Sequence, residues 1–260
     1  MKVTFYKYHG AGNDFIIFDN FNMEAPVLSS KQIKHFCQYH FGIGADGLIF
    51  LSKKEGYDFE MQYYNADGNE STMCGNGGRC MVKFALQMGI RKSNYHFLAV
   101  DGPHEAEIES DGTVRLKMKD VTQVKYHAGY AIVNTGSPHF VKFASNVEEV
   151  DVVASGRDIR YSSNFEKEGI NVNFVETIDD DSIYVRTYER GVEDETLSCG
   201  TGVTAAALVS AHNENGFNTV DVKTKGGNLS VQFDKIDDDH FENIWLCGPA
   251  VFVFKGEVEI

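Results

Sequence analysis

"MCGNGGRC", residues 73–80, places a cysteine directly before a run of glycines, and "SCGTGVTAAA", residues 198–207, repeats that order about 125 residues later. A cysteine at a helix start faces free backbone N–H groups and the positive end of the helix dipole, which favour the thiolate. The glycines permit a tight turn and let an anionic group approach the backbone. Alone, either turn also fits a buried, unreactive cysteine. Their repetition predicts two related halves, each presenting a reactive cysteine, Cys74 and Cys199.

Alternation of apolar and polar residues predicts strands along most of the chain. The expected strands are 3–8, 14–19, 47–52, 58–64, 96–101, 105–110, 113–119, 130–134, 139–143, 170–176, 183–189, 219–224, 228–233, 243–247 and 250–254. Asp111-Gly112 predicts a hairpin turn. Capping residues and helical spacing predict helices at 29–40, 76–88 and 201–212, and a shorter one within 146–156.

The order of these elements repeats as well. A strand, a glycine-rich turn and a second strand open each half, as "KYHGAGNDFIIF" (7–18) and "AIVNTGSPHFVKF" (131–143). We therefore expect an α/β protein of the α+β type with two pseudo-symmetric half-domains. Each would be a curled, mostly antiparallel sheet around a buried central helix, with the active site in the cleft between them. Residues 1–122 with 251–260 would carry Cys74, and residues 123–250 would carry Cys199.

Composition narrows the possible partners and the compartment. The formal charge of −14, without a basic stripe, argues against nucleic acid and anionic membranes. No apolar run approaches the ~20 residues that span a bilayer. The first residues, "MKVTFYKYHGAGNDF", have no apolar signal-peptide region, so we expect a cytoplasmic protein.

Cysteine and glycine patterns give no sign of a metal or a cofactor. The five cysteines are an odd number and contain no C-x-x-C, so neither a disulfide framework nor a metal site is expected. Neither a dinucleotide fingerprint after a strand nor a phosphate-loop lysine occurs, so no cofactor is expected.

Two facing thiols suit one kind of chemistry. Inversion of a carbon stereocentre needs a base on one face of the carbon and an acid on the other, because a single base tends to return the proton to the side it came from. A thiolate and a thiol fit these roles. Two helix N-termini aimed at one point would also hold a carboxylate and stabilise its developing charge.

A set of motifs in this order closely resembles the diaminopimelate epimerase family, from about Phe5 to Pro249. The motifs are "HGAGNDF" (9–15), "NADG" (65–68), "CGNGGRC" (74–80), "GSPH" (136–139), "ERG" (189–191) and "CGTG" (199–202). The resemblance implies a cofactor-independent amino acid epimerase that interconverts LL- and meso-diaminopimelate in lysine and peptidoglycan precursor biosynthesis. It also implies a homodimer and a zwitterionic small-molecule substrate.

The resemblance assigns roles to individual residues. Cys74 and Cys199 would transfer the protons, His139 would tune a cysteine, and Glu189 would lie near the distal ammonium group and a thiol. The far end of the substrate would be bound by Asn13, Asn65, Asn171 and Arg190. Backbone N–H groups at the reacting carboxylate would come from Gly75, Asn76, Gly200 and Thr201.

The sequence departs from the family pattern in three places. Gly47 stands where many members have glutamine, and Ser137 stands where others have asparagine. Glu193-Asp194 makes the loop before Cys199 one residue longer. These changes affect expected substrate contacts and leave both cysteines and the Glu189-Arg190 pair in place.

Other interpretations remain open at this stage. One is a racemase for another amino acid, and another is a redox or metal-binding module built on Cys74, Cys80, Cys199 and Cys247. Apart from the resemblance, His139 suits a surface loop, Asn65 a turn, Asn171 an exposed strand position, and Glu189-Arg190 a solvated strand end.

Overall fold

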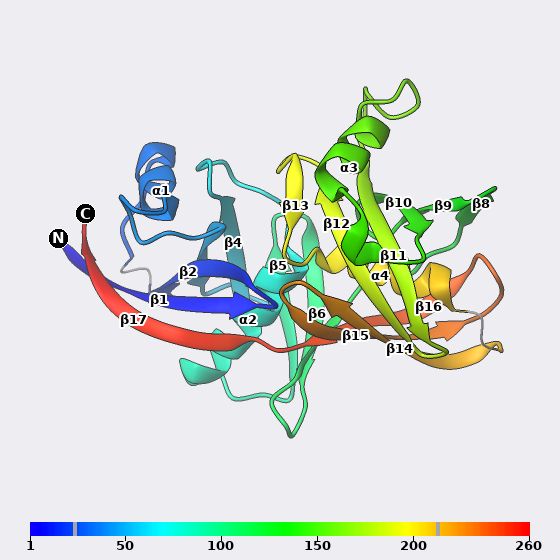
Figure 1. The fold of residues 1–260 in the computed structure, drawn as a ribbon. Helices are drawn as coiled ribbons and strands as arrows, with labels where there is room; N and C mark the ends of the chain where they lie inside the picture. Colours follow the sequence, from blue (N-terminus) through cyan, green and yellow to red (C-terminus); the bar gives the residue numbers. More distant parts are fainter. Residues whose placement is uncertain (23–24, 212–213) are drawn as a thin grey trace. The chain divides into compact units, whose positions relative to one another are not determined.

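The computed structural model describes residues 1–22, 25–211 and 214–260 (Figure 1). Its internal contacts divide the chain into two compact units, residues 1–116 with 248–260, and residues 117–247. The boundaries expected from the sequence, after residues 122 and 250, stay a prediction.

The first unit is one sheet with two helices. Its strands pair in the order β17-β1-β2-β3-β4-β5-β6-β7, with β2–β3 and β4–β5 parallel and the other neighbours antiparallel. The strands are β1 (Lys2–Gly10), β2 (Asn13–Asn20), β3 (Gly47–Ser52), β4 (Phe59–Asn65), β5 (Asn94–Ala99), β6 (Gly102–Ile108), β7 (Val114–Lys117) and β17 (Val251–Glu259). The helices are α1 (Ser30–Cys37) and α2 (Gly75–Gln87).

The second unit has the same kind of sheet. Its main strands follow the order β8-β9-β10-β11-β12-β14-β15-β16, with β10–β11 and β12–β14 parallel, and the short β13 pairs with β12. The strands are β8 (Val124–His127), β9 (Tyr130–Asn134), β10 (Pro138–Phe143), β11 (Asn171–Asp179), β12 (Ser182–Glu189), β13 (Asp194–Thr196), β14 (Gly216–Thr224), β15 (Gly227–Lys235) and β16 (Phe241–Gly248). The helices are the 3-10 turn η1 (Val147–Glu149), α3 (Val152–Arg160) and α4 (Gly200–Ser210).

Strand by strand, the two sheets have the same succession of parallel and antiparallel pairs. The order from β17 to β7 matches the order from β8 to β16, so β17, from the end of the chain, takes in the first sheet the place that β8 takes in the second. The two halves are therefore pseudo-symmetric, as predicted.

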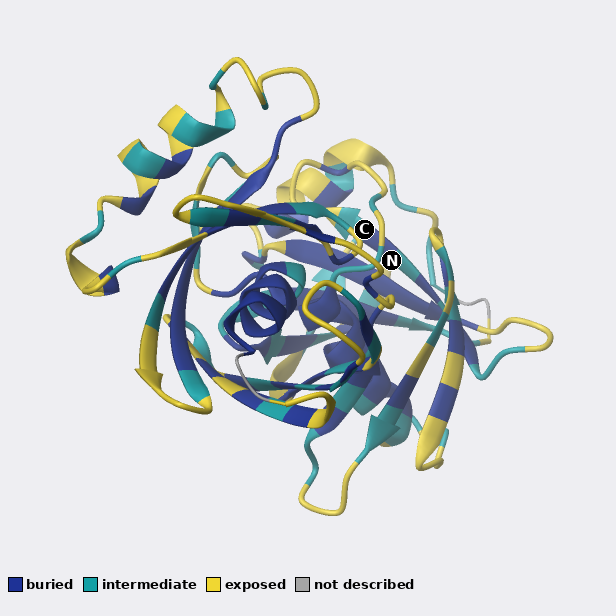
Figure 2. Ribbon diagram, turned by 90° about the vertical axis from the view of Figure 1, so that its right-hand side faces the viewer, coloured by how far each residue is buried: buried dark blue, intermediate teal, exposed yellow. Residues whose placement is uncertain are grey.

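Each sheet curls around one central helix. Helix α2 contacts β1, β2, β3, β4, β6 and β17, and helix α4 contacts β9, β10, β11, β12, β14 and β15. Both helices are buried along most of their length, because small and apolar residues cover most of their surface. Figure 2 shows this for α4, which is seen nearly end-on in the colour of buried residues, with buried residues on the strands around it. The shorter helices α1 and α3 pack on separate apolar clusters of their own units.

Most expected elements are present, with shifted ends. Ser29 caps α1 and forms a capping box with Gln32. The hairpin at Asp111-Gly112 joins β6 and β7, with Gly112 at φ +90. The helix expected within 146–156 is divided into η1 and α3. The helix expected at 201–212 ends at Ser210, and residue 212 lies outside the described residues. Strands β8 and β13 were not predicted.

Candidate active site

Cys74 is the residue that precedes helix α2. It has extended backbone angles, φ −90 and ψ 130, and its side chain makes no capping hydrogen bond. The sulfur lies 3.6 Å from Oδ1 of Asn13. The helix begins at Gly75 and Asn76, so its first backbone N–H groups follow the cysteine directly. The half-buried thiol therefore lies at the positive end of a helix, as the sequence predicts.

Asn13 is held firmly beside this thiol. Its Nδ2 donates to Oδ2 of Asp46 at 2.6 Å, and its Oδ1 accepts from Nδ2 of Asn76 at 3.3 Å. Asp46 also accepts from the Asp14 backbone N–H at 3.0 Å, and the carboxylate of Asp14 forms an ion pair with the buried Lys7 at 2.8 Å. The position of Asn13 thus follows from a charged network across β1, β2 and the loop before β3.

Arg79 supports the same helix start from inside the unit and was missed by the sequence analysis. It is fully buried and donates to Oδ1 of Asn76 at 2.8 Å and to the Gly75 carbonyl at 3.2 Å. The signal was present in "CGNGGRC", because residues three and four apart on a helix are neighbours.

Asn65 and Gly47 lie opposite each other on β4 and β3. Asn65 is exposed at the end of its strand, where its backbone forms the turn to Gly68. A Cβ on Gly47 would lie 2.4 Å from the Tyr63 ring, so the ring occupies the space of a side chain at position 47. No described contact joins Asn65 to the Cys74 group.

Cys199 precedes helix α4 in the same way, with φ −110 and ψ 111 and no capping bond from its side chain. It is buried, and its sulfur lies 3.5 Å from Oγ1 of Thr201. The Thr201 carbonyl accepts from Oγ1 of Thr135 at 2.8 Å, which ties the helix start to the turn before β10. Gly200 and Thr201 begin the helix, so the second predicted turn also has the expected geometry.

Asn171, Arg190 and Ser137 form a second group in this unit. Nδ2 of Asn171 donates to Oγ of Ser137 at 2.9 Å, and Oδ1 of Asn171 accepts from the Arg190 backbone N–H at 2.9 Å. The Arg190 guanidinium donates to the Glu168 carbonyl at 2.8 Å and to Ser137 at 3.4 Å. Asn171 is only 4% exposed, so its reading as an exposed strand position is wrong. Glu189 precedes Arg190 at the end of β12.

His139 is completely buried in β10, so the surface-loop reading of this residue is wrong. Burial first, and the positive charge of Arg190 second, lower the pKa of His139 to about 3, which keeps the ring neutral. Its Nδ1 lies 3.1 Å from Nδ2 of Asn173, which is also fully buried. The sequence analysis did not single out Asn173.

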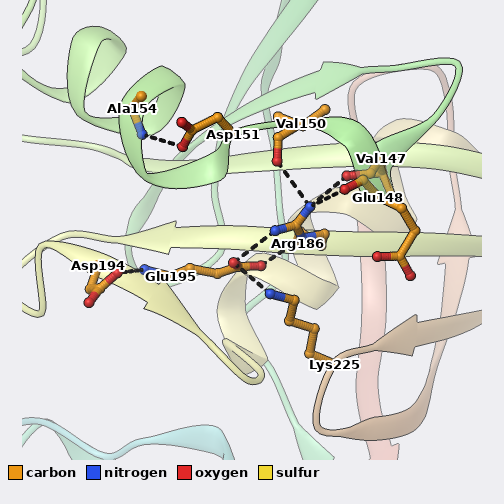
Figure 3. A network of polar contacts seen from close by, with 9 residues as sticks. All are labelled: Val147, Glu148, Val150, Asp151, Ala154, Arg186, Asp194, Glu195 and Lys225. Carbon is orange, nitrogen blue, oxygen red and sulfur yellow. Dashed lines mark hydrogen bonds and ion pairs between the residues drawn. The ribbon is translucent and has the colours of Figure 1, made fainter.

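The loop that leads to Cys199 is fixed by Arg186 on β12 (Figure 3). The guanidinium makes a bidentate pair with Glu195 at 2.7 and 2.9 Å and donates to the carbonyls of Val147, Glu148 and Val150. Glu193, one of the two residues at which the loop is longer than in the family, has a φ of +59. Its carboxylate accepts a hydrogen bond from the Tyr188 hydroxyl at 3.0 Å. The longer loop is therefore well anchored.

The other cysteines differ from Cys74 and Cys199. Cys37 and Cys80 are buried, and burial raises the pKa of Cys37 to about 12 and that of Cys80 still further. Cys247 is buried in β16. Cys37 and Cys80 therefore stay thiols near neutral pH and suit packing.

The fold matches solved structures. A PhzF-family protein from Bacillus anthracis is 16% identical with a TM-score of 0.75, over 100% of both chains. A hydroxyproline epimerase from Agrobacterium vitis is 12% identical with a TM-score of 0.71, over 99% of this chain and 92% of that chain. This likeness defines the class of fold.

Sequence relatives are more specific. The family model for diaminopimelate epimerase matches residues 5–124 and 131–253. Proteins named diaminopimelate epimerase from Flavobacterium psychrophilum and Chlorobaculum tepidum are 48% and 43% identical, each over 96% of this chain and 98% and 99% of their own lengths. The chain belongs to the diaminopimelate epimerase family.

Proposed function

We propose that the protein is an isomerase that interconverts LL-2,6-diaminopimelate and meso-2,6-diaminopimelate, a step in lysine and peptidoglycan precursor biosynthesis. Membership of the family carries this proposal. The presence of a cysteine directly before the central helix of each half supports it.

The chemistry in this proposal is a two-base proton transfer. One of Cys74 and Cys199, as thiolate, removes the proton from the α-carbon, and the other, as thiol, returns a proton to the opposite face. The roles exchange in the reverse direction. This mechanism requires both sulfurs to come close to the same carbon atom of one substrate molecule.

The helix starts supply the electrostatic part. In this proposal the N–H groups of Gly75, Asn76, Gly200 and Thr201, at the two helix starts, donate to the carboxylate at the reacting carbon. The positive helix ends would stabilise the charge that develops there. No metal or cofactor takes part in the proposed reaction.

The far end of the substrate supplies binding energy. Asn13, Asn65, Asn171 and Glu189 are the proposed polar contacts, and Arg190 would bind the distal carboxylate. The aliphatic part of the Arg190 side chain passes close to Gly169, where a Cβ would lie 2.6 Å from Cδ of Arg190. Distal contacts of this kind hold the α-carbon accurately in place, which raises the rate as well as the affinity.

The decisive experiment is incubation with LL-diaminopimelate in heavy water, with the isomer ratio and α-deuterium followed together. The wild type is expected to form the meso isomer with deuterium at the inverted carbon, without pyridoxal phosphate and in the presence of a chelator. Cys74→Ala and Cys199→Ala are each expected to abolish inversion, and Cys247→Ala, the matched control, is expected to retain it. Rapid α-deuteration of proline or lysine would instead indicate a racemase of broader specificity. One tightly bound zinc ion per chain would favour a metal module.

The working form is proposed to be a cytoplasmic homodimer. All five cysteines are free thiols, as the proposed chemistry requires of two of them. Within the described residues, no helix is long and apolar enough to cross a membrane.

The apolar side chains of residues 251–254 on β17 are 41–51% exposed, which supports a second copy of the chain at that strand. Light scattering of the wild type and of Val253→Arg tests this, with loss of the dimer expected for the variant.

A further inference from the structure

The floor beneath the central helix is apolar in the first half. Phe15, Ile49 and Tyr63 lie on the adjacent strands β2, β3 and β4, with Ile49 directly opposite Tyr63. The third residue after Cys74 is Gly77, whose Cβ would lie 3.3 Å from Ile49 and 3.5 Å from Phe15. Phe15 and Ile49 therefore lie directly under the first turn of α2, and the Tyr63 ring packs beside Phe15.

The corresponding positions of the second half are polar. His139, Asn173 and Thr187 lie on β10, β11 and β12, with Asn173 directly opposite Thr187. The third residue after Cys199 is Gly202, whose Cβ would lie 2.4 Å from Oδ1 of Asn173 and 3.4 Å from the Cys199 sulfur. The strand registers and the helix glycines give the same correspondence, so three buried polar side chains replace Phe15, Ile49 and Tyr63.

Hydrogen bonds fix the direction of this polar group. Oγ1 of Thr187 donates to Oδ1 of Asn173 at 2.9 Å, and Nδ2 of Asn173 donates to the Phe140 carbonyl at 3.1 Å. A carbonyl oxygen only accepts, so the nitrogen of the Asn173 amide must point to this side. The same nitrogen lies 3.1 Å from Nδ1 of His139. Nδ1 therefore accepts, and a neutral ring must carry its proton on Nε2.

The second ring nitrogen of His139, Nε2, differs from Nδ1 in its surroundings. Nε2 of His139 is buried and has no hydrogen-bond partner among the described residues. A buried N–H without an acceptor is costly, and histidines that only fill a core normally have both nitrogens paired. The unpaired Nε2–H group therefore fits a donor that finds its acceptor only when the substrate is bound.

Burial first, and the positive charge of Arg190 second, favour the neutral ring of His139. Arg190 acts on it directly, and Glu189 lies two strands away in the same sheet. Of the packed elements, β9 contributes Tyr130, which stacks on Phe140, and β11 contributes Glu176, which accepts from the Val147 N–H. Helix α4 has no ionisable side chain beyond the preceding Cys199.

We propose that Asn173, held by Thr187, is a positioning residue that fixes His139 as the neutral Nε2–H tautomer, a hydrogen-bond donor toward an anionic acceptor in the substrate-bound active site. The assignment of the tautomer does not depend on which reaction the protein catalyses, whereas its expected effect on turnover rests on the proposed function. His139 then stabilises negative charge and is not the base that removes a proton. The two halves therefore carry equivalent cysteines, but the side chains under the two central helices differ in polarity.

The test is Asn173→Asp, read first by nitrogen-15 NMR of the histidine rings in the substrate-free protein. In the wild type, Nδ1 of His139 is expected to be unprotonated and Nε2 protonated from about pH 5 to 8. The aspartate has no N–H to donate and accepts from Nδ1, so the variant is expected to carry a proton on Nδ1 and to titrate within this range. Asn218→Asp is the matched control, since Asn218 is a buried asparagine whose Nδ2 donates to the carbonyls of Glu214 and Gly216.

Thr187→Val is the second variant, which keeps the size of the side chain and removes the anchor of Asn173. It is expected to give a mixture of both tautomers. A wild-type ring that carries its proton on Nδ1, or an Asn173→Asp ring with the wild-type spectrum, would overturn the proposal.

Epimerisation supplies the second readout. Asn173→Asp is expected to lower kcat/KM by roughly tenfold or more and to add an ionisation between about pH 5 and 8 that the wild type and Asn218→Asp lack. Wild-type rates and pH profile in a variant with the altered tautomer would refute the positioning role. Absence of diaminopimelate turnover in the wild type would refute the proposed function and leave the NMR result standing.

Discussion

Tyr63 explains at the scale of single residues why position 47 is glycine. A Cβ there would lie 2.4 Å from a ring carbon and 3.0 Å from the ring hydroxyl. The ring is 8% exposed and packs edge-on against Phe15, with centroids 6.0 Å apart. An aromatic ring therefore takes the room that the family's glutamine would need. The sequence indicates that position 47 departs from the family, but the compensating ring follows only from the packing.

Arg190 carries a prediction at this scale. Arg190→Lys keeps the charge but loses the planar pair of donors that binds a carboxylate, so kcat/KM for diaminopimelate is expected to fall roughly 10–100-fold. Steady-state kinetics with both isomers measures the effect. Arg91→Lys, at an exposed arginine, is the control and is expected to leave the rates unchanged. An Arg190→Lys enzyme with wild-type kcat/KM would remove Arg190 from the proposed binding site.

The place of a residue in the structure could be predicted where a short motif determines the local backbone geometry. Both cysteines stand at the helix starts that their glycine turns indicate. The burial of His139 and Asn171 could not be predicted from local pattern, because a polar residue in a short strand is equally consistent with either face. Asn173 was missed for the same reason, since its partners lie on two other strands, β10 and β12.

At the scale of elements, the Arg186–Glu195 pair connects β12, η1 and β13. Burial alone would raise the pKa of Glu195, but hydrogen bonds from Arg186 and Lys225 outweigh it and hold that pKa below its ordinary value. Below about pH 4.3, the ordinary glutamate pKa, the unfolded chain therefore binds more protons at this residue than the folded one. The stability contributed by the ionised pair is present above that pH and is lost as the pH falls through the lowered pKa.

Glu195→Gln tests this linkage. Near neutral pH the variant is expected to be about 1.5–3 kcal/mol less stable than the wild type, because it loses charged hydrogen bonds. The difference is expected to shrink as the pH falls through the lowered pKa, which urea unfolding at a series of pH values would follow. A difference that stays constant down to about pH 3 would contradict the assignment. Glu55→Gln, at an exposed loop glutamate, provides the baseline.

The elements missed from the sequence share a physical cause. Only Val124 of β8 is buried, and β13 has three residues in a charged loop, so neither shows an apolar alternation. Both exist as strands because a neighbouring strand pairs with them. Helix α1, by contrast, was predictable because its capping box lies within four consecutive residues.

At the scale of the whole molecule, the repeated order of strands and glycine turns was sufficient to predict two pseudo-symmetric halves. The difference between the apolar side chains under α2 and the polar side chains under α4 was not predictable, since it depends on which strand positions become neighbours. The proposed reaction adds a requirement on the halves together, because both sulfurs must reach one carbon atom.

Oxidation of the substrate-free protein tests that requirement. Mild oxidation is expected to join Cys74 to Cys199, with loss of activity that dithiothreitol restores. Peptide mapping identifies the linked cysteines, and bound diaminopimelate is expected to slow the reaction. Formation of a Cys74–Cys80 link in its place would argue against the proposed meeting of the two thiols.

The place of β17 has a consequence for how the chain is made. This last strand pairs with β1 along its length, and the Met1 and Ile260 backbones bond to each other at 2.8 and 2.9 Å. During synthesis on the ribosome, residues 1–116 emerge before residues 117–247, yet their sheet lacks strand β17 until residues 251–259 leave the exit tunnel. Residues 117–247 contain all the strands from β8 to β15 and most of β16. The half that is translated first is therefore the last to be completed.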